Sequence, residues 1–170
     1  LRDVSLDAKS LLDLARYRYQ ETILNYHYRS VYEELISFSN HAFYDGKLII
    51  SPNQSEPVKP PIEYVHVDDG IFDNRRNIQE AKSVIRLIKK IFKDRQNNET
   101  IGVITFNSTQ RDQIENLIDE ELFKRGKYQK EFERELFRAD DGEDTSLFVK
   151  NIENVQGDER DIIIFSMGYA

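Results

Sequence analysis

Two short stretches of this chain are apolar at nearly every position, which leaves few structures open to them. Residues 101–106 read I-G-V-I-T-F, and residues 162–165 read I-I-I-F. An amphipathic helix or a half-exposed strand would show polar residues at regular intervals, whereas a strand buried on both faces shows an unbroken apolar run. The sequence therefore predicts two buried strands of a parallel sheet, at 101–106 and at 161–167.

The segments around these strands carry the periodicity of helices. Residues 77 to about 95 place apolar side chains on one helical face, and Asn77 and Glu80 have the spacing of a capping box. A second helix is predicted from about Ser108 to Lys124. Strands that alternate with helices of this length indicate an α/β fold, a three-layer domain with a mainly parallel sheet covered on both faces. Further predicted elements are helices at 6–20, 29–46 with a left-handed cap at Gly46, and 128–138, strands at 22–28, 62–67 and 147–149, and a proline-rich surface connection at 51–61.

Composition limits the class of protein. A chain of 170 residues, 39% of them hydrophobic, can bury one core, so a single domain is expected. A formal net charge of −7 argues against a protein that coats nucleic acid with its whole surface, but leaves a local basic groove open. No apolar run approaches the roughly 18 residues of a membrane helix, and the absence of cysteine favours a cytoplasmic location. The missing initiator Met suggests a piece of a longer protein.

Two kinds of site are not expected. A phosphate-binding P-loop needs the pattern G-x-x-x-x-G-K-[ST], and the seven glycines never show that spacing, so the chain should not hydrolyse ATP alone. A metal site is not predicted either. The histidines at 27, 41 and 66 lack the spacing of metal ligands, and the acidic run at 140–144 misses the calcium-loop pattern and is expected to be a solvated loop.

Three polar loops qualify as ligand sites, because ligands of parallel sheets bind where the strands end. The first, at 28–30, contains Arg29, which could direct its guanidinium at a phosphate or form a surface ion pair with Glu33. The second contains Thr105, Phe106, Asn107 and Ser108. Their hydroxyls and N–H groups could hold a nucleic-acid phosphate while Phe106 stacks on a base, and Asn107 or Ser108 could also simply cap the following helix.

The third loop, Gln156–Asp161, leads into the last apolar strand. Gly157 permits close approach of the backbone to a ligand, Gln156 can donate and accept hydrogen bonds, and Glu159 can accept from a ribose hydroxyl. An ordinary polar turn with solvated charges would have the same composition.

The three loops together resemble motifs of the second RecA-like domain of superfamily one helicases, in the branch of the Upf-like and DNA2-like enzymes. Residues 24–30 (L-N-Y-H-Y-R-S) and the following 35–48 look like the Tyr-Arg motif of that branch, with its helix and its F-Y-x-G-x-L ending. Ile101–Gln110 is similar to I-G-V-I-T-P-Y-x-x-Q, and Gln156–Ser166 is similar to motif V, Q-G-R-E-K-D-x-I-I-L-S. The matches come in the family's order and span about residues 22–168.

The resemblance implies an ATP-driven motor on single-stranded DNA or RNA, with ATP held between two RecA-like domains. Residues 22–170 would be the second of these domains, cut before motif VI, and 1–21 a helical lead-in. By motif position, Arg29 would be the catalytic arginine that reaches the γ-phosphate, and Gln156, Gly157 and Glu159 would contact ATP. Residues 105–108 would lie on the nucleic-acid path. The partners implied are single-stranded nucleic acid and the missing first RecA-like domain, which would also hold the Mg²⁺ that accompanies ATP.

Two departures from the family pattern bear on these roles. Phe106 and Asn107 replace the usual Pro-Tyr, and Asp158 stands where the family usually has Arg, which makes a phosphate contact from that side chain unfavourable. Two other hypotheses stay open from the sequence. One is a degenerate helicase-like domain that only binds a protein partner, in line with the acidic charge. The other is a nuclease, for which no acidic cluster has convincing spacing.

Overall fold

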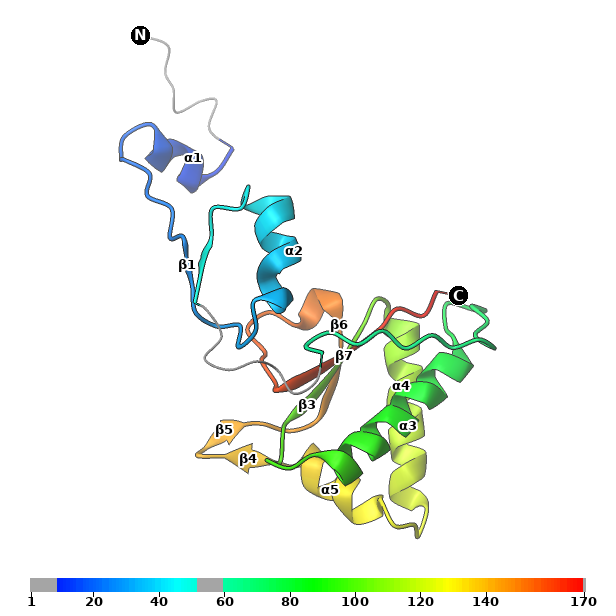
Figure 1. Ribbon diagram of the computed structural model, residues 1–170. Coiled ribbons are helices and arrows are strands. Elements are labelled where there is room, and N and C mark those ends of the chain that lie inside the picture. The colour runs from blue at the N-terminus through cyan, green and yellow to red at the C-terminus, as the bar shows by residue number, and fades with distance from the viewer. Residues whose placement is uncertain (1–8, 52–59, 170) are drawn as a thin grey trace. The chain divides into compact units, whose positions relative to one another are not determined.

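The computed structural model describes residues 9–51 and 60–169, and the chain forms two compact units that divide between Val65 and His66 (Figure 1). The sequence predicts a lead-in at 1–21 and one domain over 22–170. The assignment of both units to one RecA-like domain stays a prediction. Among the described residues, no helix has the length and apolar character needed to cross a membrane.

The first unit pairs two short strands. Strand β1 (Tyr26–His27) runs parallel to β2 (Ile49–Ile50). Helix α1 (Leu11–Arg16) begins after Ser10, whose hydroxyl oxygen accepts a hydrogen bond from the Asp13 N–H at 3.1 Å. Residues 6–8 of the helix predicted over 6–20 lie outside the described residues. Within the described residues this helix ends at Arg16 rather than at 20, and the strand predicted over 22–28 is limited to Tyr26–His27.

Helix α2 (Glu34–Phe43) differs from its prediction at the start and agrees with it at the end. It begins at Glu34 rather than at Arg29–Ser30. At its end, the Gly46 N–H donates to the Asn40 carbonyl at 2.9 Å with Gly46 at a φ of +69°, which confirms the predicted left-handed cap. The predicted apolar stripe buries no residue, and Phe38 is exposed. Two strands of two residues each offer too little surface to cover such a stripe.

The strand predicted at 62–67 is wrong. These residues form no strand, and Ile62 and Tyr64 are exposed. Alternation of β-branched and aromatic residues favours a strand only where a neighbouring backbone completes its hydrogen bonds. Most of the predicted proline-rich connection, residues 52–59, lies outside the described residues.

The second unit is built on a parallel sheet whose described strands have the order β6–β3–β7 (Figure 1). β3 (Ile101–Thr105) is central and is buried throughout, and β6 (Phe148–Asn151) and β7 (Ile162–Ser166) pair with it on either side. Gly102 lies under the Phe148 ring, where a Cβ would stand 2.5 Å from a ring carbon, so this close approach requires glycine. The predicted mixed α/β fold with a parallel sheet is confirmed.

Three helices pack with this sheet around one apolar core. They are α3 (Ile78–Asp94), α4 (Ser108–Phe123) and α5 (Gln129–Leu136), and they lie within two residues of their predicted bounds. Alternate residues of β3 and β7 point to the helices, as period-2 strands require. The buried apolar side chains of the core are Ile101, Val103 and Ile164 of the sheet, Leu147 before β6, Ala81, Val84, Ile85 and Ile88 of α3, Ile114 and Ile118 of α4, and Phe132 of α5.

The acidic segment 140–144 is solvent-exposed, as predicted, and forms a hairpin. Strands β4 (Ala139–Asp140) and β5 (Glu143–Asp144) pair antiparallel. The two residues between them, Asp141 and Gly142, have positive φ angles of +52° and +86°, as the tightest hairpin turns require.

A side-chain clamp fixes β3 against β7 at their amino ends. The Asp161 carboxylate accepts hydrogen bonds from the N–H and the hydroxyl of Thr100, both at 2.8 Å, and the Asp161 N–H donates to the Thr100 hydroxyl at 2.9 Å. Because register in a parallel pair is otherwise set only by backbone bonds and packing, this reciprocal contact selects the observed alignment.

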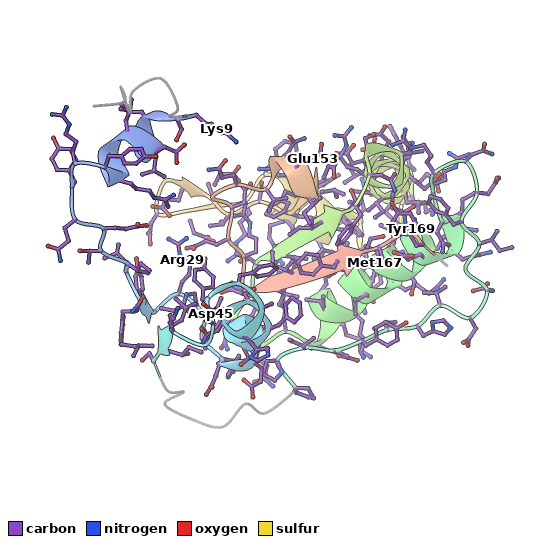
Figure 2. All side chains as sticks on the ribbon, turned by 90° about the horizontal axis from the view of Figure 1, so that it is seen from above. Lys9, Arg29, Asp45, Glu153, Met167 and Tyr169 are labelled. Atoms are coloured by element: carbon purple, nitrogen blue, oxygen red, sulfur yellow. The ribbon has the colours of Figure 1, made fainter. Side chains whose placement is uncertain are left out.

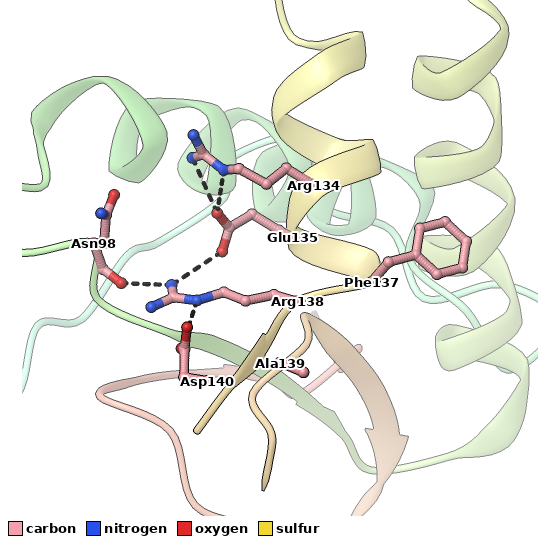
Figure 3. A pocket seen from close by; sticks show the side chains of 7 residues that line it. All are labelled: Asn98, Arg134, Glu135, Phe137, Arg138, Ala139 and Asp140. Atoms are coloured by element: carbon pink, nitrogen blue, oxygen red, sulfur yellow. Dashed lines mark hydrogen bonds and ion pairs between the residues drawn. The ribbon is translucent and has the colours of Figure 1, made fainter. Parts of the chain in front are cut away.

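A buried ion-pair cluster around Glu135 of α5 joins that helix to Arg95 at the end of α3. Figure 3 shows its Arg134 and Arg138 members. Glu135 is 2% exposed and accepts from Arg95 at 2.5 Å, from Arg134 at 3.1 Å and from Arg138 at 3.4 Å. Burial alone would raise the pKa of Glu135, but the hydrogen bond and charge of Arg95, the hydrogen bond of Arg134 and the charge of Arg138 outweigh it and hold the pKa below its usual value. The cluster borders a hollow of about 400 Å³ lined by Asn98, Arg134, Glu135, Phe137, Arg138, Ala139 and Asp140.

Replacing Glu135 with Gln should lower the free energy of unfolding by about 3 kcal/mol at pH 7, because Arg95 would lose its buried counter-charge. Since the folded-state pKa of Glu135 is lowered, its contribution is complete above the ordinary carboxyl pKa of about 4.3 and is lost as the pH falls through the folded-state pKa. The gap between wild type and variant should therefore narrow in acid.

Urea unfolding at pH 7 and at a series of lower pH values measures this gap. Glu133→Gln is the matched control, because Glu133 is exposed on the same helix, and it should change stability by less than about 0.5 kcal/mol. Equal losses in the two variants would contradict the assigned role of Glu135.

Candidate functional site

Arg29 lies in a short turn after β1 that a histidine holds in shape. The Ser30 N–H donates to the His27 Nε2 at 3.1 Å, and the Ser30 hydroxyl lies 2.8 Å from the same atom. Tyr28 and Arg29, between them, are exposed. Together with Tyr26 and His27 they border a hollow of about 200 Å³. Arg29 (labelled in Figure 2) thus shares this hollow with two tyrosines.

The residues 105–108 lie at the carboxyl edge of the sheet, which we define as the edge where β6, β3 and β7 end at Asn151, Thr105 and Ser166. Thr105 is fully buried, and its hydroxyl donates to the Asn107 carbonyl at 3.0 Å, so its side chain shapes the loop from within. Phe106 is half-buried and Ser108, the first residue of α4, is exposed.

Asn107 is the N-cap of α4 and also carries an unpartnered donor. Its Oδ1 accepts from the Gln110 N–H at 2.9 Å, which fixes the orientation of the amide. Asn107 is only 7% exposed, so water does not replace a missing protein partner easily. Its buried Nδ2 nevertheless has no hydrogen-bond partner among the described residues. The Oδ1 of Asn151 at the same edge is likewise buried without a partner. The predicted cap is confirmed, and the edge holds spare hydrogen-bonding capacity.

The loop that contains Gln156, Gly157 and Glu159 leaves the carboxyl end of β6 and crosses to the amino end of β7. All three residues are exposed, and Gly157 has a φ of +86° with no heavy atom within 4 Å of a Cβ position. The sequence predicts that the whole 156–161 loop lies at the carboxyl ends of the parallel strands. That expectation is wrong for Asp161, which binds Thr100 at the amino edge of β3.

Asp158, the departure from the family pattern, has a structural partner. Lys150 of β6 donates to both of its carboxylate oxygens at 2.8 Å, and the ammonium lies 5.1 Å from the centre of the Phe148 ring. Lys150 is a residue that the sequence reasoning missed. Lys150 lies opposite Ile104 in the register of β6 and β3. Its role could not be predicted from the sequence, because its partner comes from the loop that crosses to β7.

The sequence reasoning also missed a buried polar network behind the 105–108 loop. Gln110 is fully buried, its Nε2 donates to the Ser166 hydroxyl at 3.0 Å, and its Oε1 accepts from the Asn77 N–H at 2.8 Å. Glu80 therefore does not complete the predicted capping box, because the Asn77 N–H is already bonded. The other half of the box is confirmed, since Asn77 Oδ1 accepts from the Glu80 N–H at 3.0 Å. The sequence held one indication of this network, since Gln110 lies on the apolar face of the helix, four residues before Ile114.

The structure thus brings Thr105, Asn107 and Ser108 together with the end of β7 and leads the 156–161 loop away from that edge. Arg29 belongs to the other unit, and each unit is described by itself. Among the described residues, no group of three or more His, Asp or Glu side chains could hold a metal ion.

Comparisons with known proteins agree with a helicase relationship. The chain is 41% identical over 169 residues to an uncharacterized ATP-dependent helicase of Mycoplasma genitalium. The aligned region covers 98% of this chain and 15% of the relative. This chain is 43% identical over 148 residues to the homologous protein of Mycoplasma pneumoniae, covering 87% of the chain and 13% of that relative. The chain therefore spans only a small part of the length of these curated relatives.

Residues 7–169 match the protein family described as "AAA domain". The match includes the parallel sheet with its three helices and all three loops considered above. The chain belongs to the AAA domain family.

Proposed function

We propose that this chain is the second RecA-like motor domain of an ATP-dependent superfamily one helicase, of the Upf-like and DNA2-like branch. In the complete protein it would complete the ATP site and contact single-stranded nucleic acid. The AAA domain family, the names of the two relatives and the order of the three motifs support this proposal.

The observation that carries the nucleic-acid contact is the unpartnered Asn107 Nδ2 at the amino end of α4. A buried N–H without an acceptor costs about 1–3 kcal/mol, and the first turn of a helix favours an anion. A phosphate oxygen of the backbone would satisfy both. Exposed Ser108 would add a hydroxyl and Phe106 a stacking face, while Thr105 would act only by shaping the loop.

The 156–161 loop and Arg29 would serve the nucleotide. The open space around Gly157 fits a ligand that approaches the backbone closely, and exposed Gln156 offers a donor and an acceptor. Glu159 would accept from a ribose hydroxyl. ATP would supply the phosphoryl group, with Mg²⁺ held by the first RecA-like domain, and Arg29 would stabilise the charge on the transferred group. A cytoplasmic location also remains part of the proposal.

A second candidate function is favoured by the exposed acidic hairpin at 139–144, which could bind a basic protein partner. Such a degenerate helicase-like domain would need neither nucleotide nor nucleic acid. The two experiments that follow separate the candidates, because a protein-binding domain would show neither a dependence on Arg29 nor salt-sensitive binding of oligonucleotides.

Replacing Arg29 with Ala in the full-length protein should lower nucleic-acid-stimulated ATPase turnover on the order of a thousandfold, because an arginine at the transferred phosphate contributes about that much or more. Arg29→Lys should recover little, since a point charge cannot replace the planar fork. Steady-state ATPase assays with a saturating oligonucleotide measure the effect. Arg18→Ala, at an exposed site of the same unit, is the control. Unchanged turnover in Arg29→Ala would show that the role is wrong.

Replacing Asn107 with Asp should weaken oligonucleotide binding by the full-length protein at least about tenfold, because the cap oxygen is kept while the free donor becomes a negatively charged acceptor. Titration of a labelled single-stranded oligonucleotide at several salt concentrations measures affinity and its salt dependence. Asn97→Asp adds the same charge at an exposed position and should bind like wild type. If both variants bind equally, Asn107 does not face nucleic acid.

A further inference from the structure

The Glu80 carboxylate does not bind the amino end of its own helix, α3. It binds the last residue of β7 and the backbone that follows this strand. It accepts from the Ser166 hydroxyl at 2.7 Å and from the Gly168 N–H at 2.9 Å and 3.1 Å. No Lys or Arg in the described part of the chain forms an ion pair with it. The carboxylate is therefore held by hydrogen-bond donors and by the favourable first turn of α3.

The contact is continued towards the candidate nucleic-acid site by a chain of polar groups. The Gln110 amide donates to the Ser166 hydroxyl, which donates in turn to Glu80. The backbone N–H of the same Gln110 donates to Asn107 Oδ1. Glu80 thus orients the Ser166 hydroxyl as a donor toward itself, which leaves its oxygen to accept from Gln110.

The backbone at Gly168 completes the arrangement. Gly168 is buried, has a φ of +78°, and lies so close that a Cβ on it would stand 3.7 Å from Asn107 Nδ2 and 3.8 Å from the Gln110 side chain. The residues on either side, Met167 and Tyr169, are exposed where the chain leaves β7 (Figure 2). Glu80 therefore holds the one buried residue of this segment against the amide that carries the unpartnered donor.

We propose that Glu80 is a positioning residue for nucleic acid. Through its hydrogen bonds to Ser166 and Gly168, it fixes the backbone that lies beside the Asn107 amide and so keeps that amide in place. This inference rests on the proposed function and assigns its nucleic-acid site a supporting residue from α3. A carboxylate is needed because it accepts from all its donors without presenting one of its own. A Gln at this position would place an amide N–H against another donor.

The test uses the full-length protein with the substitution Glu80→Gln. The concentration of single-stranded oligonucleotide that half-saturates ATPase stimulation should rise at least about tenfold, as for other supporting residues of binding sites. Basal ATPase turnover and the KM for ATP without oligonucleotide should stay unchanged. Ser166→Ala, a milder change in the same network, should shift the oligonucleotide dependence in the same direction.

A double-mutant cycle distinguishes positioning from general destabilisation. Because Glu80 acts through Asn107, the double variant Glu80→Gln, Asn107→Asp should bind oligonucleotide no more weakly than Asn107→Asp alone. Additive losses, or a fall in basal turnover together with the oligonucleotide effect, would overturn the proposal. Glu115→Gln, an exposed carboxylate of α4, is the matched control and should behave like wild type.

Hydrogen exchange supplies a readout independent of ATPase activity. In Glu80→Gln the Gly168 amide should exchange at least about tenfold faster than in wild type, since its acceptor is weakened. An unchanged rate would overturn the inference and leave the proposed function standing. A wild-type protein that shows no oligonucleotide-stimulated ATPase would instead overturn the proposed function, and this inference with it.

Discussion

Parallel pairing of β3 with a strand on each side is the constraint on which the second unit depends. Every residue of β3 is buried, so each backbone N–H and C=O must find a partner in β6 or β7. Both neighbours run parallel to β3, so all three strands end at one edge. The chain emerging from β3 at that edge supplies the cap of α4, and the chain entering it carries Thr100, which aligns β7.

Local pattern located the main strands and helices of the second unit and was less informative for the first. Unbroken apolar runs located β3 and β7, and helical stripes located α3 and α4, because each pattern meets a core in the same unit. In α2 the stripe is equally regular, yet Phe38 stays exposed and the helix begins four to five residues late. Residues 62–67 alternate like a strand and form none. Apolar periodicity predicts which face of a segment could be buried. Whether that face is buried depends on a neighbouring element, which the local sequence does not reveal.

The candidate site shows the same division between local and distant information. Asn107 as a helix cap follows from its neighbours, since its partner is Gln110, three residues away. The contacts of Glu80 with Ser166 and Gly168 join residues 86 and 88 positions apart, and the capping-box spacing pointed to a different partner. The family resemblance supplied the roles proposed for Arg29 and the 156–161 loop. It could not indicate that the loop crosses from one edge of the sheet to the other.

The ion pair between Lys150 and Asp158 bears on how such a loop can diverge. The motif that this loop resembles has Arg where Asp158 stands, and an Arg here would set two cations against each other at the place where Lys150 now donates both bonds. A positive charge at position 158 would therefore be compatible with this loop path only if Lys150 also lost its charge. The charge carried by the crossing loop is thus linked to the charge on β6, the strand it leaves.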